Sequence, residues 1–187
     1  MGEVKQIILC GFGGQGVILA GTILGYAGIN DGKWVAGSSS YGSQARGGYA
    51  RSEVVISDKP ISFPRVVEAD ILVAMFQNAY DKYIEYVERE NGIVIYDEPL
   101  VSTKEINDLR QIGVPATNIA TSELNNKQVA NLVILGAAVG ITKMVTKDAL
   151  ISAIEKNVPG RFKALNLKAV ELGLNWEDKI KENINSF

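Results

Sequence analysis

The feature that most constrains this chain is a glycine-rich turn near its N-terminus, with the sequence GFGGQG at residues 11–16. The turn directly follows the apolar run Ile7, Ile8 and Leu9, and it precedes a long apolar stretch typical of a helix. A short apolar run, a turn of glycines and a helix together indicate a β–α unit whose helix begins at the turn. Such units build α/β sheets with parallel strands, so this segment alone favours that fold class.

Further along the chain, short apolar runs predict strands, and the periodic stretches between them predict helices. We expect strands at residues 4–10, 33–37, 70–75, 92–96 and 113–120, the last interrupted by Pro115, and an alternating, half-exposed, antiparallel strand at 49–57. We expect helices at residues 14–30, 78–89, 129–141, 146–157 and 161–172, one beginning at Ser102 with a capping box to Glu105, and one beginning at Trp176 with Asn175 as its cap. Residues 38–48 have the composition of a long loop.

Strands and helices alternate throughout, and most of the predicted strands are apolar on both faces. This pattern predicts an α/β, Rossmann-like three-layer sandwich. Its sheet should be mostly parallel with one or two antiparallel additions, and helices should follow at the C-terminal end. We find no internal repeat and no linker, so we expect one domain over residues 1–187.

Composition and charge exclude several classes of protein. The 19 Lys and Arg residues nearly balance the 21 Asp and Glu residues, and no basic run occurs, which argues against a nucleic-acid-binding protein. No apolar run reaches the roughly 18 residues that span a bilayer, and the N-terminus does not resemble a signal peptide. We therefore expect a cytoplasmic protein without a membrane segment.

The chain has no histidine and a single cysteine, Cys10. It therefore lacks the commonest general base, and it has too few ligands to build an iron–sulfur cluster or a structural zinc site by itself. We expect Cys10 to be an inert residue of the core. Any redox chemistry must then come from an organic cofactor or from another chain.

The turn matches the dinucleotide-binding pattern G-x-G-x-x-G, and the start of the following helix favours an anion such as a phosphate. A dinucleotide site also needs an acidic residue at the end of the second strand, about 20 residues further on. Here that strand ends in Ala36, Gly37 and Ser38, and Asp31 comes before it. Three alternatives stay open: a bound NAD(P) or FAD, a tight turn for helix–sheet packing, and another phosphate-bearing group shared with a partner chain.

Two further motifs allow more than one interpretation. In the loop, Arg46 precedes Gly47 and Gly48, and its guanidinium could be solvated, contact a partner or anchor a phosphate or carboxylate of the substrate. The stretch NLVILGAAVG at residues 131–140 places Asn131 in an apolar helix rich in small residues. It indicates either core packing, with Asn131 capping a neighbouring loop, or a subunit interface. The helical spacing of Tyr80, Tyr83 and Tyr86 favours packing over a base-stacking platform.

Several stretches occur in the same order in one known family. They are GFGGQGV (11–17), YGSQARGGYARSEVVIS (41–57), EADILVAM (68–75), PATNIA (115–120) and NLVILGA (131–137). Together they resemble the gamma subunit of 2-oxoacid:ferredoxin oxidoreductases, over almost the whole chain to about residue 173. The loop followed by RSEVVIS is most similar to the 2-oxoglutarate, KorC-type branch, and the branched-chain and pyruvate branches remain open.

The resemblance implies a non-catalytic subunit of a complex that converts a 2-oxoacid, coenzyme A and oxidised ferredoxin to acyl-CoA, CO2 and reduced ferredoxin. It implies alpha and beta subunits that bind thiamine diphosphate and Mg, a ferredoxin-like delta subunit with iron–sulfur clusters, and no cofactor held tightly by this chain. It also implies that the domain lines the coenzyme A entrance. The residues that match the family's motifs there are Gly13, Gly14, Gln15, Gly16, Arg46, Gly47 and Gly48. The alternatives are a stand-alone NAD(P)- or flavin-binding protein and a scaffold module that binds a phosphate ligand.

Overall fold

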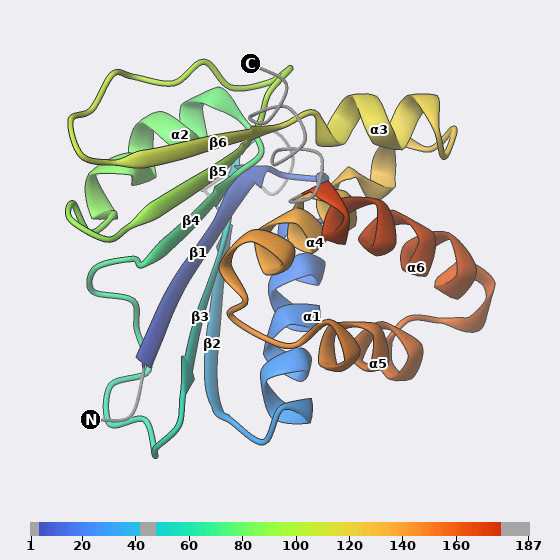
Figure 1. The fold of residues 1–187 in the computed structure, drawn as a ribbon, viewed down its shortest axis with the longest axis horizontal. Helices are drawn as coiled ribbons and strands as arrows, with labels where there is room; N and C mark the ends of the chain where they lie inside the picture. Colours follow the sequence, from blue (N-terminus) through green and yellow to red (C-terminus); the bar gives the residue numbers. More distant parts are fainter. Residues whose placement is uncertain (1–3, 42–47, 177–187) are drawn as a thin grey trace.

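The computed structural model describes residues 4–41 and 48–176, which form one sheet surrounded by helices (Figure 1). The strands are β1 (Val4–Phe12), β2 (Trp34–Tyr41), β3 (Tyr49–Ser57), β4 (Ile71–Ala74), β5 (Ile93–Asp97) and β6 (Arg110–Val114). The helices are α1 (Val17–Asn30), α2 (Gln77–Tyr83), α3 (Ala116–Ser122), α4 (Ala130–Thr142), α5 (Lys147–Asn157) and α6 (Gly160–Leu174), with the 3-10 turns η1 (Ile84–Tyr86) and η2 (Lys127–Val129).

The strands lie in the order β2-β3-β1-β4-β5-β6. Neighbours from β1 to β6 are parallel, whereas β3 is antiparallel to both β1 and β2. The mostly parallel sheet with an antiparallel addition is therefore confirmed. The sequence did not predict that β3 lies between β1 and β2.

Helices cover both faces of the sheet, which makes three layers (Figure 1). Side chains of β1 alternate between two cores, as the pleat of a strand requires. Ile7 and Leu9 belong to the larger core with α1 and α4, and Ile8 and Cys10 belong to the smaller core with α2. The predicted α/β sandwich is confirmed.

The C-terminal helices add a further layer outside α1 and α4 (Figure 1). Helix α5 packs on α1, and α6 packs on α4. A Cβ at Gly136 of α4 would overlap the carbonyl oxygen of Val170 in α6, so the two backbones approach as closely as glycine allows. The small residues of α4 therefore serve packing within the chain, and the alternative of a subunit interface at this helix is wrong.

The helix expected from Ser102 does not form, and residues 101–106 have no regular secondary structure. Side chains of α2 bind the backbone instead: the Ser102 amide donates to Oε1 of Gln77 (2.7 Å) and the Lys104 amide to the hydroxyl of Tyr80 (2.9 Å). These tertiary hydrogen bonds satisfy the amides that a helical first turn would leave free. The local capping pattern of Ser102 and Glu105 is overridden.

Pro115 separates two elements rather than interrupting one strand. Strand β6 ends at Val114, and α3 begins at Ala116 directly after the proline. A proline is well tolerated at a helix start, where its missing N–H has no intrahelical partner to lose. The prediction of a strand at 113–120 is therefore wrong from residue 115 onward, where Pro115 and helix α3 follow.

Two further predictions change in extent. Strand β2 continues to Tyr41 and takes residues 38–41 from the predicted loop, because they pair with β3. Strand β3 is mostly buried rather than half-exposed, and even Glu53 is only 4% exposed. Residues 42–47 and the predicted C-terminal helix beyond Trp176 lie outside the described residues, and Asn175 ends α6.

The helix predicted at 78–89 is shorter than expected, because α2 ends at Tyr83, η1 follows, and Val87 pairs with Ala69. The Thr146 hydroxyl accepts a hydrogen bond from the Ala149 amide (3.2 Å) and so caps α5 as expected. No helix among the described residues is both long and apolar enough to cross a membrane.

Candidate functional site: the glycine turn at the end of β1

The glycine turn lies at the carboxyl end of β1, at the upper end of the sheet in Figure 1. From β1 the chain passes through α1 to β2 on one side, while β4 lies on the other side of β1. Ligands of open α/β sheets bind in the crevice at such a switch point. The turn is therefore placed where the fold most readily holds a ligand.

Glycine is required at two positions of this turn. Gly14 has φ 103° and Gly16 has φ 75°, which are conformations that other residues adopt only with strain. Gly16 immediately precedes α1, so it sets the direction in which the helix leaves the sheet.

Gly48, from the segment before β3, lies against the turn. The Gly13 amide donates a hydrogen bond to the carbonyl oxygen of Gly48 (2.9 Å). The structure therefore brings together Gly13, Gly14, Gln15, Gly16 and Gly48 of the predicted set. Arg46 and Gly47 lie outside the described residues.

The side chain of Gln15 folds inward and joins two strands. Its Oε1 accepts a hydrogen bond from the Phe12 amide (2.6 Å), and its Nε2 donates to the carbonyl oxygen of Met75 directly after β4 (2.9 Å). A Cβ at Gly11 would lie 2.7 Å from that Oε1, so glycine at position 11 leaves room for the amide. The Gln15 side chain thus fills the end of the gap between β1 and β4.

Asn131 supports the turn from α4. Its side chain is buried, and its Nδ2 donates a hydrogen bond to the carbonyl oxygen of Gly16 (3.0 Å). A Cβ at position 16 would overlap this nitrogen. The prediction that Asn131 caps a neighbouring loop is confirmed, and the loop is the glycine turn.

The N-terminus of α1 is open to an anion. No side chain caps its first amides, and its first turn contains no acidic residue. Free amides and the helix dipole give such an end a partial positive charge. These features favour an anion over a cation at this end of α1.

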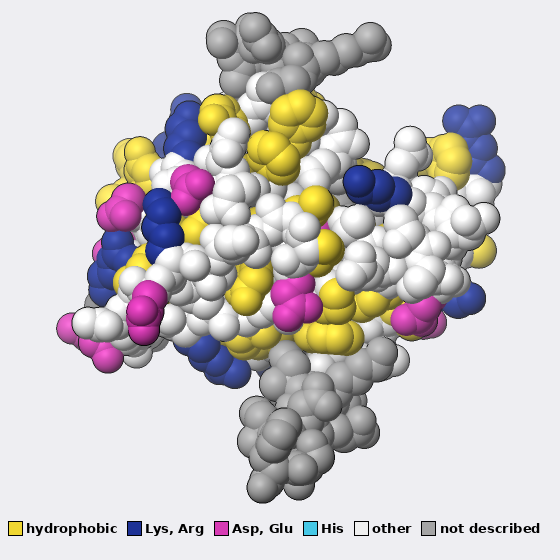
Figure 2. Space-filling model, turned by 90° about the horizontal axis from the view of Figure 1, so that it is seen from above, with side chains coloured by type: hydrophobic (Ala, Val, Ile, Leu, Met, Phe, Trp, Pro, Cys, Tyr) yellow, Lys and Arg dark blue, Asp and Glu magenta, His cyan; other side chains and the backbone are white. Residues whose placement is uncertain are grey.

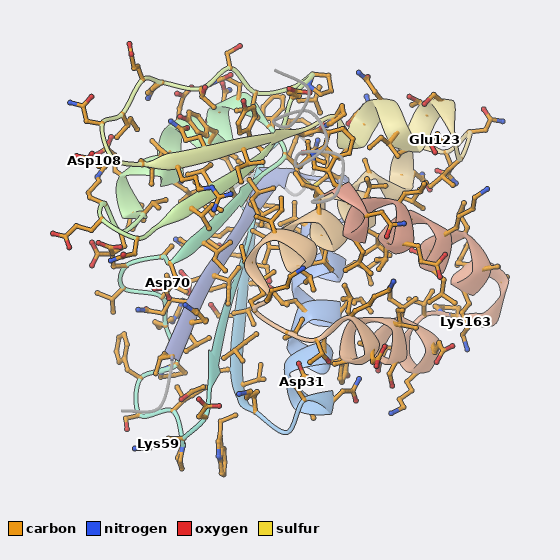
Figure 3. All side chains as sticks on the ribbon, in the orientation of Figure 1. Asp31, Lys59, Asp70, Asp108, Glu123 and Lys163 are labelled. Carbon is orange, nitrogen blue, oxygen red and sulfur yellow. The ribbon has the colours of Figure 1, made fainter. Side chains whose placement is uncertain are left out.

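The second half of a dinucleotide site is absent from this sheet. In a Rossmann fold the strand that carries the ribose-binding acid neighbours β1, but here β3 separates β2 from β1. The Ser38 hydroxyl near the end of β2 donates to Oε2 of Glu53 on β3 (2.9 Å). Asp31 binds the amide and the hydroxyl of Thr146 (both 2.6 Å) at the far end of α1 from the turn (Figure 3). Among the described residues, Asp31 thus lies away from the turn, and the end of β2 carries no acidic side chain.

Two groups of charged residues toward the carboxyl ends of the parallel strands were missed by the sequence analysis. On the sheet face opposite α1, an Arg51 nitrogen lies 2.7 Å from a Glu53 oxygen, and the guanidinium carbon lies 5.2 Å from the ring centre of Tyr83. The alternation of Arg51 and Glu53 along the strand was the available signal. In Figure 2, which looks onto the carboxyl ends of the strands, Lys, Arg, Asp and Glu side chains gather at the left, and the middle is largely neutral and hydrophobic.

Asp97 is the second missed residue, at the end of β5. Burial raises the pKa of its carboxyl group, and hydrogen bonds from Thr117 oppose this rise. The carboxylate accepts from the Thr117 amide (3.0 Å) and from the Thr117 hydroxyl (2.5 Å), so it ties α3 to the sheet. An acid directly after an apolar strand was the signal.

Cys10 is fully buried beneath the turn, and burial strongly raises the pKa of its thiol. An inert core thiol was predicted and is confirmed.

Tyr80 and Tyr83 are buried, which confirms packing for these two rings, whereas Tyr86 is exposed and contacts Tyr83. Among residues 4–41 and 48–176, no three His, Cys, Asp or Glu side chains lie close enough to hold a metal ion.

Comparisons with known proteins agree with this architecture. The profile of the family "Pyruvate ferredoxin/flavodoxin oxidoreductase" matches residues 6–176. A 2-oxoglutarate synthase subunit KorC from Methanocaldococcus jannaschii is 47% identical over 90% of this chain and 91% of its own length. A KorC subunit from Methanothermobacter thermautotrophicus is 41% identical, over 90% of this chain and 93% of its own length.

Solved structures share the fold. The gamma subunit of a keto/oxoacid ferredoxin oxidoreductase from Geobacter sulfurreducens has a TM-score of 0.80 and 38% identity, covering 91% of this chain and 96% of its own. The chain belongs to the pyruvate ferredoxin/flavodoxin oxidoreductase family and groups with its gamma-type, KorC-like subunits.

Proposed function

We propose that this chain is the non-catalytic gamma subunit of a thiamine-diphosphate-dependent 2-oxoglutarate:ferredoxin oxidoreductase. We further propose that residues 1–187 form a single domain. The observation that carries the proposal is the 47% identity to a KorC subunit along nearly the whole of both chains. Pyruvate synthase subunits are more distant, at 27% and 30% identity. This ranking favours 2-oxoglutarate as the substrate of the complex.

In the proposed reaction the complex cleaves the bond between the carboxylate and the oxo carbon of 2-oxoglutarate. The carboxylate leaves as CO2, and the thiol sulfur of coenzyme A bonds to the oxo carbon to give succinyl-CoA. The two electrons released pass to ferredoxin, and the thiol proton passes to solvent.

The described residues of this chain do not fit the metal centres of that reaction. The sequence has no histidine, its single cysteine is buried, and no metal-binding cluster occurs in the part of the chain that the structure describes. We therefore assign thiamine diphosphate and Mg to alpha and beta subunits and the clusters to a ferredoxin-like delta subunit. No catalytic step is assigned to this chain.

The glycine turn is our candidate for contact with a phosphate of coenzyme A. The uncapped amides at the start of α1 favour an anion, and Gly14 is open, since a Cβ there would meet no atom within 4 Å. Because the Gln15 amide fills the gap between β1 and β4, the anion would lie on the outside of the turn. The proposed contacts are Gly13, Gly14, Gln15, Gly16, Arg46, Gly47 and Gly48.

The proposal is tested by co-expressing the tagged chain with the neighbouring subunits of its native host and purifying the complex. We expect chains that contain thiamine diphosphate and iron to co-purify, together with ferredoxin reduction that requires both 2-oxoglutarate and coenzyme A. A complex without thiamine diphosphate and iron would overturn the proposal. Activity with another 2-oxoacid but not with 2-oxoglutarate would overturn the substrate assignment.

The role of the turn has its own test in the same complex. Arg46→Ala should raise the KM for coenzyme A about tenfold with kcat unchanged, because it removes a guanidinium group that can donate two hydrogen bonds to a phosphate. Arg89→Ala is the matched control, since Arg89 pairs with Glu85 on the surface. An unchanged KM for coenzyme A in the Arg46 variant would show that Arg46 does not contact coenzyme A.

A further inference from the structure

Helix α1 and strand β2 form one surface without charge. Neither Val17–Asn30 nor Trp34–Tyr41 contains an Asp, Glu, Lys or Arg residue. Large apolar side chains are nevertheless exposed on both elements. They are Leu19, Tyr26 and Ile29 on α1, and Tyr41 on β2. We call these four residues and the slot between the two elements the α1–β2 surface.

The slot lies between α1 and β2 and has a volume of about 340 Å³. Its lining includes Gly25, Tyr26, Ile29, Val35, Gly37 and Ser39. Glu53 also lines it, but the Glu53 carboxylate is bound by Ser38 and Arg51. The slot is therefore mainly apolar and presents no unpaired charge.

The two glycines of the slot are not explained by the fold of the chain. A Cβ at Gly25 would meet only Val35 at 3.6 Å, and a Cβ at Gly37 only the Glu53 carbonyl oxygen at 3.7 Å, both ordinary contacts. Neither glycine has a positive φ. In contrast, Gly21 and Gly28 of the same helix lie against side chains of the sheet. The absence of side chains at 25 and 37 keeps the slot open.

Strand β2 is also an unprotected edge. It pairs with β3 on one side and has no strand on its other side within the described residues. Natural edge strands are usually protected by charges, proline or short length. The eight residues of β2 have neither a charge nor a proline. An edge of this kind is typical of a surface that another chain covers.

The relatives indicate which chain covers it. In the ketoisovalerate oxidoreductase subunit VorA of Methanothermobacter marburgensis, the match covers 93% of this chain but only 37% of that protein. A domain equivalent to this one is thus joined to a larger remainder in a single polypeptide. Covalent linkage keeps two domains at high effective concentration, so a surface between them is the expected consequence. This favours a larger partner chain over a second copy of this one.

We infer that the α1–β2 surface is the docking site for the large partner chain of the complex. The partner presents an uncharged surface with one apolar side chain that enters the slot between Gly25 and Gly37. The inference rests on the proposed function, because it takes its partner from the same complex.

The test uses the tagged full chain co-expressed with the other subunits and measures the ratio of large chain to tagged chain after purification. Gly25→Leu fills the slot, and Ile29→Lys and Leu19→Lys each place a charge on the surface. Phe162→Lys is the matched control, since Phe162 lies on α6 and is 45% exposed, against 57% for Ile29. Each of the three surface variants should lower the ratio at least tenfold, while Phe162→Lys leaves it unchanged and all four isolated chains melt near the wild-type temperature.

The outcomes separate the two proposals. If the large chain co-purifies equally with the wild-type chain and with the folded surface variants, the inferred docking site is wrong and the proposed function stands. If the surface variants instead lose self-association and still recover the large chain, the surface joins two copies and the inference is overturned. If the wild-type chain recovers no thiamine-containing chain, the proposed function fails and the docking site fails with it.

Discussion

Helices α1 and α4 are similar in sequence but differ in what covers them. Both are apolar, rich in glycine and free of charge. Eleven of the thirteen residues of α4 are buried, because α6 packs over its outer side. Only seven of the fourteen residues of α1 are buried, and Leu19, Tyr26 and Ile29 remain exposed. The sheet and α5 cover the other sides of α1. A helix with the composition of a buried helix that leaves one apolar side uncovered indicates a missing partner.

The glycines of the two helices differ in the same way. Gly136 of α4 is required by the backbone of α6, whereas Gly25 of α1 lies beside open space. The same substitution should therefore have opposite effects at the two positions. The predictions below test this difference, beginning with the largest expected effect.

Gly136→Ala should destabilise the isolated chain by about 3 kcal/mol, because the new methyl group would overlap the Val170 carbonyl oxygen and force α4 and α6 apart. Urea unfolding followed by circular dichroism measures the change. Gly160→Ala is a suitable control, since a Cβ at position 160 meets no atom within 4 Å. A loss below about 1 kcal/mol at position 136 would show that the helices separate at little cost.

Asn131→Ala should cost about 2 kcal/mol, because it removes the hydrogen bond to Gly16 and leaves a cavity beneath the turn. This variant removes the hydrogen bond that joins the buried helix α4 to the turn before the half-buried helix α1. Thermal unfolding measures it. If stability is unchanged, Asn131 does not hold the glycine turn.

Gln15→Ala should cost about 1 kcal/mol, because the Phe12 amide and the Met75 carbonyl lose their partner and water must replace it. Gln15 is only half-buried, so the cost should be smaller than at Asn131. Amide exchange at Phe12, measured by NMR, should speed up in the variant. An unchanged exchange rate would contradict the hydrogen bond.

Gly25→Ala should stabilise the isolated chain by about 0.5–1 kcal/mol, since alanine is the better helix former and the space beside Gly25 is open. The same urea measurement that is used for Gly136→Ala determines the sign. A loss of stability would mean that the slot is closed in the isolated chain.

Much of this fold could be predicted from apolar runs. The strands near Ile7, Val73 and Val94 and the helices α1, α4, α5 and α6 follow local patterns of burial. The helix from Ser102 failed because Gln77 and Tyr80 take up backbone groups that a local pattern cannot assign. The position of β3 between β1 and β2 also depends on pairings that no single segment encodes.

The candidate site was only partly predictable for the same reason. The glycines at 14 and 16 followed from a residue type that tolerates a positive φ, and the support from Asn131 followed from an amide that needs partners when buried. The inward fold of Gln15 could not be predicted, because its partner Met75 lies 60 residues away in the sequence. Likewise, the pair formed by half-buried Arg51 and buried Glu53 has the sequence pattern of the exposed face of a strand.

The most direct test of the difference between the α1–β2 surface and the buried helix α4 is hydrogen–deuterium exchange of the chain, free and in its purified complex. We predict that amides of β2 (Trp34–Tyr41) exchange at least tenfold more slowly in the complex, because a partner covers the open edge. Amides of α4 are already buried in the free chain and should change little. Equal exchange of β2 in the free chain and in the complex would contradict the account.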